Sequence, residues 1–336
     1  MRRRGFPGSL APRGLAGLEG LAVALATVGV LACVSIFVGA IPLSPAALFA
    51  GGKSEGASVL LASRIPRTVA LVLAGSAMAV AGLIMQMLSR NRFVEPGTAG
   101  TIESATLGLL LCALLAPDLP VPARMLVACG AALLGTLLFL AILRRAPLRS
   151  PLMVPLVGLM LGGVINAAAT FLAYRFNLIQ SLVAWSTGDF SSVLRGRYEL
   201  LWISFAAALA ASITADRFTV AGLGRDFAGN LGLNYRATLM TGLLIVSLAT
   251  AAVVATVGAI PFVGLVVPNV VSMIVGDNVR RAVPWTATLG AGFVLVCDII
   301  GRSVTRPYEI PVGPIIGIAG SVIFLLLMKR GTARFG

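Results

Sequence analysis

The chain alternates long apolar stretches with short segments that carry most of its charged residues. A helix that spans a membrane needs about 20 apolar residues, because each residue advances the helix axis by about 1.5 Å. The stretches that clearly meet this requirement are 20–42, 65–88, 125–143, 152–174, 198–215, 237–257, 282–301 and 310–328. The pattern therefore predicts an all-α, polytopic membrane protein.

Two further apolar stretches are less regular. Residues 97–116 carry Glu103, and residues 259–275 are short and interrupted by Pro261 and Pro268. Prolines within a span leave backbone groups unpaired, which is tolerated only against protein or a water-filled cavity. Broken helices at membrane depth often line a substrate path. Counting both stretches, the pattern predicts about ten crossings, with the two termini on the same side.

Loop lengths and charges predict the orientation of the spans and the division of the chain. The loops are short, so residues 1–336 are expected to form one membrane domain, with an N-terminal tail at 1–19 and a long inside loop at 216–236. If the N-terminus is cytoplasmic, most of the 26 Lys and Arg residues lie in inside loops, as the positive-inside rule expects. The apolar run 21–43 exceeds the length of a signal-peptide core, so we expect a first span there.

Composition excludes several classes of protein. With 58% apolar and 11% charged residues, the chain has too few polar side chains to cover a water-facing surface, where about 25% charge is usual. The net charge of +14 does not indicate nucleic-acid binding, because the basic residues are scattered and form no aromatic-plus-basic face. Histidine is absent and the four cysteines are isolated in apolar runs, so we predict no catalytic residue and no metal site.

Two other classes of membrane protein stay as alternatives. An ion-coupled secondary transporter usually needs carboxylates within its spans, and Glu103 and Asp298 are the candidates for that role. A membrane-embedded enzyme would need clustered reactive side chains, which the sequence does not show. Uptake that collapses with an uncoupler at constant ATP would favour the first class, and product formation by the purified chain would favour the second.

Four motifs carry a resemblance to a known family. They are RIPRT at 64–68 with the apolar run that follows to Gln86, NRFVEPGTAG at 91–100, GAIPFVGLVVPN at 258–269, and the set Asp298, Arg302 and EIPVG at 309–313. In this order and spacing they resemble the FecCD-type permeases, the ABC importer subunits for iron chelates, haem and cobalamin. The resemblance implies the type II (BtuC-like) importer permease fold in the bacterial inner membrane, with about ten transmembrane helices and both termini in the cytoplasm.

The resemblance also implies a set of partners. The chain is expected to pair with a second permease subunit, as a homodimer or a heterodimer, and with two cytoplasmic ATP-binding subunits. A periplasmic or lipoprotein siderophore-binding protein would deliver the ferric siderophore. The chain lacks the GxxxxGK[ST] loop that cradles phosphates, so we predict a transporter subunit that binds no cofactor, with ATP used by its partner.

The inside loop 216–236 is expected to transmit the work of ATP hydrolysis. Its segment 227–233, FAGNLGL, resembles the short coupling helix of the family, which fits a groove on the ATPase. A plain solvated loop is the alternative. The residues predicted to couple to the ATPase are Arg225, Asp226, Ala228, Asn230, Leu231 and Gly232.

Arginines at the outside ends of the spans are the predicted docking residues. Arg64, Arg67 and Arg302 match family positions that meet carboxylates on the binding protein, and a guanidinium pairs bidentately with a carboxylate. The alternatives are snorkelling to the membrane interface and, for Arg302, a local pair with Asp298 four residues earlier.

The inside loops 89–96 and 144–151 resemble the segments that close the cytoplasmic end of the pathway. The predicted path and gate residues are Gln86, Asn91, Pro96, Glu103, Leu148, Arg149, Ser150, Pro268 and Asn269. The runs at 258–269, 276–278 and 307–311 look closest to permeases for ferric catecholate siderophores. Hydroxamate siderophores, haem and cobalamin stay as alternative substrates, and the intact chelate is expected to cross by alternating access.

Overall fold

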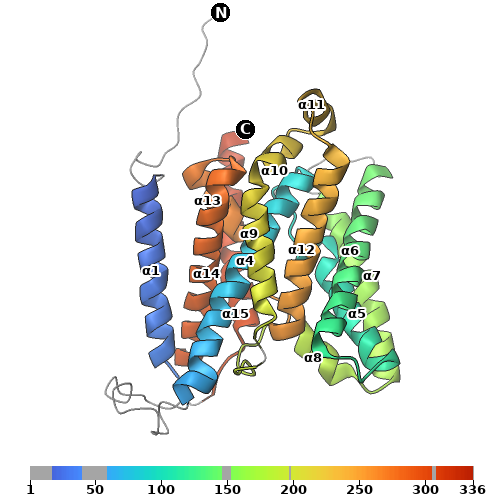
Figure 1. Cartoon of the computed structure of the whole chain (residues 1–336), viewed down its shortest axis with the longest axis vertical. Coiled ribbons are helices and arrows are strands. Elements are labelled where there is room, and N and C mark those ends of the chain that lie inside the picture. The colour runs from blue at the N-terminus through green and yellow to red at the C-terminus, as the bar shows by residue number, and fades with distance from the viewer. Residues whose placement is uncertain (1–16, 40–58, 146–152, 197, 305–307, 336) are drawn as a thin grey trace, which may run out of the picture.

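The computed structural model describes the chain except residues 1–16, 40–58, 146–152, 197, 305–307 and 336. The regular structure within the described residues is helical, and the longer helices run side by side in one bundle (Figure 1). The elements are α1 (Leu18–Phe37), η1 (Leu60–Arg64), α4 (Ile65–Ser89), η2 (Gly97–Ala99), α5 (Thr101–Leu115), α6 (Val121–Arg145), α7 (Met153–Arg175), α8 (Ile179–Ser186), α9 (Leu201–Ile213), α10 (Ala215–Gly222), α11 (Arg225–Asn230), α12 (Tyr235–Val257), α13 (Val263–Val275), α14 (Val279–Val304) and α15 (Val312–Phe335).

The predicted membrane spans are found in the helices. Among the described residues, seven helices are long and apolar enough to cross a membrane, and the pair α9 and α10, bent by 66°, makes an eighth candidate. The two irregular stretches correspond to the shorter apolar helices α5 and α13. The all-α, polytopic fold class is confirmed, and each predicted stretch overlaps one of these helices.

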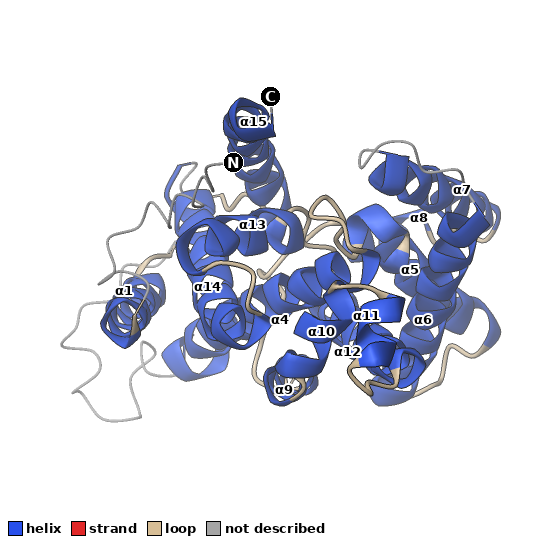
Figure 2. Ribbon diagram, turned by 90° about the horizontal axis from the view of Figure 1, so that it is seen from above, coloured by secondary structure: helices blue, strands red, loops and turns tan. Residues whose placement is uncertain are grey.

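Helix α4 lies at the centre of the bundle and packs against α14, α12, α13 and α9 (Figure 2). Over its most apolar window it is 89% buried by other helices, so little of it would face lipid. Small residues allow this, because helix backbones in lipid approach closely only where side chains are small. A Cβ atom at Gly75, for example, would lie 2.7 Å from the carbonyl oxygen of Gly290 in α14.

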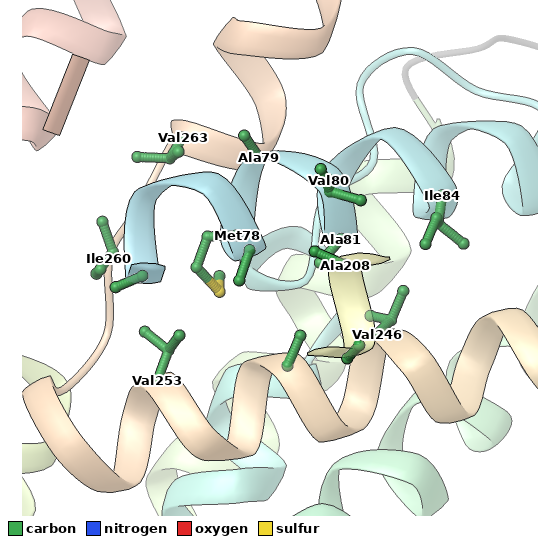
Figure 3. Close-up of a cluster of buried hydrophobic side chains, with 14 of the residues drawn as sticks. Met78, Ala79, Val80, Ala81, Ile84, Ala208, Val246, Val253, Ile260 and Val263 are labelled. Carbon is green, nitrogen blue, oxygen red and sulfur yellow. The ribbon is translucent and has the colours of Figure 1, made fainter. Parts of the chain in front are cut away.

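Apolar side chains fill the remaining space around α4 (Figure 3). Met78 and Ile84 of α4 pack with Val246 and Val253 of α12, and Ile260 closes the cluster beside the start of α13. Lipid tails are as apolar as these side chains, so the hydrophobic effect does not drive the cluster together. It is stabilised by dispersion contacts between closely packed side chains.

The outer helices present large apolar side chains away from the bundle. The most apolar windows of α1, α7 and α15 are only 11%, 22% and 22% buried. Exposed residues of α7 include Met160 and Val164, and those of α15 include Ile318 and Leu325. Such surfaces fit lipid or another membrane helix.

The long inside loop predicted at 216–236 contains two short helices, α10 and α11, in place of a plain loop. Figure 1 shows α11 at the same end of the bundle as the start of α1 and the end of α15. The start of α1 and the end of α15 therefore lie at the same end of the bundle, as an even number of crossings requires. Their cytoplasmic location stays a prediction.

Candidate translocation path, ion cluster and coupling helix

Two segments without α-helix enter the bundle and meet at Glu95. One joins α4 to α5 and the other joins α12 to α13. The Glu95 side chain, 4% exposed, accepts the backbone N–H of Phe262 at 3.1 Å. Phe262 precedes α13 with φ at 62°. The carboxylate thus meets one of the unpaired N–H groups at the broken start of α13, which explains how the break is tolerated inside the bundle.

The predicted gate residues Gln86, Pro268 and Asn269 come together between α4 and α13. The Gln86 Nε2 donates to the carbonyl oxygen of Gly264 at 3.2 Å, and the Asn269 Nδ2 donates to the carbonyl oxygen of Arg92 at 2.8 Å. The three residues line a crevice of only about 10 Å³. The crevice is far too small for a chelate, so this part of the bundle is closed in the structure.

The other gate candidates lie in the segment between α4 and α5, in α5 or outside the described residues. Asn91 and Pro96 are buried in the segment between α4 and α5, where the Asn91 Oδ1 accepts the N–H of Phe93 at 2.8 Å. Leu148, Arg149 and Ser150 lie outside the described residues. The gating role of all these residues stays a prediction.

An ion pair that the sequence did not predict joins this segment to the end of α13. The Arg92 Nη2 lies 2.7 Å from the Asp277 Oδ2, and the Ser272 Oγ donates to the other oxygen of Asp277. Both charged side chains are more than half exposed, so the pair is easily broken and remade. The two residues are 185 positions apart, and no pattern in the sequence connects them.

A larger cavity of about 280 Å³ lies between α5, α7 and the end of α8. The residues that line it are Ile102, Glu103, Thr106, Gly162, Gly163, Asn166, Ser186 and Ala259. Glu103 is in the first turn of α5, and its Oε2 is buried without a hydrogen-bond partner. The predicted path residue therefore lies on a real cavity, while its role in transport stays a prediction.

A buried ion cluster holds together α4, α14 and the segment before α15. The Arg67 Nη2 lies 2.8 Å from the Asp298 Oδ1, and the Arg67 Nη1 lies 2.5 Å from the Glu309 Oε2. Arg302 pairs with the other oxygen of Asp298 and donates to the carbonyl oxygen of Ser35 in α1 at 2.9 Å. Two cations and two anions thus balance in the cluster, which buried charges require.

The three predicted docking arginines all form ion pairs or hydrogen bonds with other residues of the chain. Arg67 and Arg302 are 8% and 4% exposed, and the local pair of Arg302 with Asp298, weighed as an alternative, is present. The Arg64 Nη1 donates to the carbonyl oxygens of Ile36 and Phe37, each at 3.1 Å. Docking through these arginines stays a prediction, and it would require them to exchange partners.

Helix α11 presents an apolar tip at one end of the bundle. Ala228 is fully buried, whereas Leu231 and Phe227 are each 66% exposed. Asp226, Asn230 and Gly232 are also exposed, and only the backbone of Arg225 is described. Phe227 was absent from the predicted coupling residues, although its spacing of four from Leu231 places both on one helix face. Exposed apolar patches on water-facing surfaces mark sites of protein contact.

Comparison with known proteins identifies the chain. The family model described as the FecCD transport family matches residues 27–330. The chain belongs to the FecCD transport family. It is a permease of the ABC importer class, a multi-pass inner-membrane subunit that works with ATPase and substrate-binding partners. The resemblance seen in the sequence motifs is confirmed.

Several curated relatives match this FecCD permease over most of their length. It is 49% identical to the petrobactin import system permease protein YclN of Bacillus subtilis, covering 90% of this chain and 96% of the relative. It is 43% identical to the petrobactin import system permease protein FatD of Bacillus anthracis, covering 92% and 90%. The ferric-anguibactin transport system permease protein FatD of Vibrio anguillarum is 42% identical over 81% of this chain and 87% of its own.

A solved structure supports the fold of the FecCD permease independently. A metal-chelate type ABC transporter in an inward-facing conformation matches with a TM-score of 0.78 at 21% sequence identity. The match covers 93% of this chain and 99% of the other. Identity at this level shows the fold alone.

Proposed function

We propose that this FecCD permease imports ferric siderophores across the inner membrane by alternating access, with work supplied by a separate ATPase subunit. The family match over residues 27–330 carries the proposal. Relatives named for the siderophores petrobactin and anguibactin support the substrate class at 42% identity or more. The motifs at 258–269 and 307–311 favour the catecholate type. A hydroxamate permease matches at 33% identity and supplies the alternative.

The path is proposed to run between two permease subunits, along the side that carries α7 and α15. Both helices lie on one side of the bundle (Figure 2), and both expose large apolar side chains. A second subunit would cover part of this surface, and the remainder would form a wide wall with weak contacts. A bulky chelate suits such a wall, because tight contacts would retain it. The closed crevice at Gln86 would open only when the ATPase moves α11.

The substrate is tested by uptake of radioiron-labelled siderophores into vesicles that hold the complete importer. We expect ATP-dependent accumulation of ferric catecholates when the second permease subunit, the ATPase and the binding protein are all present. If ferric hydroxamates entered the vesicles and ferric catecholates did not, the proposed catecholate substrate would be wrong. Loss of uptake on adding an uncoupler at constant ATP would overturn the ABC mechanism in favour of ion coupling.

The variant Leu231→Glu tests the coupling helix. Because Leu231 is 66% exposed, a charge there should leave the fold intact while it weakens the apolar contact with the ATPase. Hot-spot contacts of this kind are worth about 2 kcal/mol or more, so we expect iron uptake to fall at least about tenfold. The measurements are uptake and co-purification of the ATPase.

A matched control is Leu115→Glu, which places the same charge on a leucine that is 80% exposed at the end of α5. Helix α5 ends at the opposite end of the bundle from α11 (Figure 1), so this variant should bind the ATPase normally. Normal uptake by Leu231→Glu, with the ATPase bound as tightly as in the wild type, would overturn the coupling role of α11.

A further inference from the structure

The cavity beside Glu103 has a polar composition that the packing of α5 and α7 does not require. Its polar side chains are Glu103 and Thr106 of α5, Asn166 of α7 and Ser186 of α8. Among the residues that the structure describes, no Lys or Arg lines it. A volume of about 280 Å³ suits one substituent of a ligand and not a whole chelate.

The hydroxyl groups of this cavity face it as hydrogen-bond acceptors. The Thr106 Oγ1 donates its proton to the carbonyl oxygen of Ile102 at 3.0 Å, and the Ser186 Oγ donates to that of Leu182 at 2.8 Å. Each hydroxyl has one proton to donate, so these two hydroxyls offer a ligand only lone pairs, while the Asn166 amide can also donate. The Glu103 Oε2 adds a third acceptor, which is buried and has no partner within the protein.

The helix N-terminus and burial act in opposite directions on the charge of Glu103. Glu103 lies in the first turn of α5, where the helix N-terminus stabilises an anion. On the opposite wall, a Cβ atom at Gly162 would lie 3.2 Å from the Glu103 Cδ, so glycine at this position leaves the carboxylate more room. A carboxylate within a membrane span is costly and is usually matched by a cation or a polar ligand.

We propose that these residues, the Glu103 site, contact substrate groups that donate hydrogen bonds and carry positive charge, such as a protonated amine at the edge of a ferric chelate. The inference rests on the proposed import of ferric siderophores and adds a chemical preference to it. An amine would pair with Glu103 and lie within reach of the hydroxyls of Thr106 and Ser186. An anionic substituent at the same position would be repelled.

The test uses two synthetic ferric chelates that differ only in one group, a free amine in the first and its acetamide in the second. Uptake of each is measured in vesicles that hold the complete importer. Charge-assisted hydrogen bonds are about twice as strong as neutral ones, so Glu103→Gln is expected to slow uptake of the amine chelate about fivefold. Uptake of the acetamide chelate should change less than about twofold, because the acetamide is neutral and forms no charge-assisted hydrogen bond that the variant could remove.

Two further variants make the result specific. Thr106→Val removes one acceptor while keeping the side-chain shape, so it should reduce uptake of the amine chelate in the same direction, by about twofold. If Glu103→Gln does not accumulate in the membrane, Thr106→Val is used in its place to test the inference. Asp118→Asn makes the same chemical change at an exposed residue of the turn after α5 and should leave both rates unchanged.

The outcomes separate this inference from the proposed function. If the wild type imports both chelates and the Glu103 and Thr106 variants slow both equally, or slow neither, the amine preference is overturned while import stands. If the wild-type importer accumulates no ferric chelate of either kind, the proposed function fails and the preference fails with it.

Discussion

Replacing Gly82 by leucine is expected to prevent the permease from assembling its central helices. A Cβ atom at Gly82 would lie 2.0 Å from the carbonyl oxygen of Gly264 and 2.2 Å from the Gly264 Cα. Both are backbone atoms, so no rotation of a side chain can relieve the clash. The start of α13 would have to move away from α4, which would break the hydrogen bonds from Gln86 to Gly264 and from Phe262 to Glu95.

Overpacking of a buried site costs about 1–3 kcal/mol and occasionally more, and the backbone clash places Gly82→Leu at the upper end of that range. We expect little monodisperse protein in detergent and a clear drop in the unfolding temperature of what remains. Gly82→Ala should show the same defect to a smaller degree. The measurements are size-exclusion chromatography and thermal unfolding of the purified permease.

Gly130→Leu is the matched control for this prediction. Gly130 lies in α6 and is exposed, and a Cβ atom there would have nothing within 4 Å. The control should therefore elute and unfold as the wild type does. If Gly82→Leu behaved in the same way as the control, α4 and α13 would not be in backbone contact at Gly82.

Replacing Asp298 by asparagine is the second change with a large expected effect. Asp298 is fully buried and pairs with both Arg67 and Arg302, which are 8% and 4% exposed. Without its charge, one cation of the cluster is left buried and uncompensated. Removal of one partner from a buried ion pair costs about 3–5 kcal/mol, so the unfolding temperature in detergent should fall markedly.

An exposed ion pair in the same protein gives the control. Asp216 pairs with Arg280 at 3.2 Å, and both side chains are largely exposed, so Asp216→Asn should cost about 1 kcal/mol or less. The double variant Asp298→Asn with Arg302→Met should be more stable than Asp298→Asn alone, because it removes the unpaired cation. An Asp298→Asn variant no less stable than Asp216→Asn would contradict the buried cluster.

The ion cluster also bears on the proposed docking of a binding protein. Asp298 and Glu309 occupy the arginines that the carboxylates of a partner would need. The side chain of Glu309 is 28% exposed, whereas that of Asp298 is fully buried. A partner would therefore reach the Glu309 side of the cluster first.

Helix boundaries show where sequence reasoning lost accuracy. In the stretch predicted at 97–116, the short 3-10 turn η2 comes first and the α-helix begins only at Thr101, because Gly100 has a φ of 74° that ends η2. The stretch predicted at 259–275 becomes helical at Val263, after the left-handed Phe262. The start of α13 is held by Glu95, which lies 167 positions away in the segment before α5, so local propensity could not locate that start.

The contacts that assemble the site depend on distant residues. Arg67 and Asp298 are 231 positions apart, and Glu95 is 167 positions from Phe262. The sequence does show that Glu103 is an ionisable residue within a span. It does not show that Thr106 and Ser186 face the same cavity, or that their protons are already donated to their own helices.

The sequence by itself determined the fold class, the approximate spans and the family of this permease. Lipid offers no hydrogen bonds to the backbone, so apolar stretches of sufficient length must be helical wherever they lie in the chain. Only the tertiary structure decided which arginines are buried, which glycines bring backbones into contact, and where acceptors gather around a cavity. Those features arise from contacts between residues far apart in the chain, and they form only when helices of matching shape pack together.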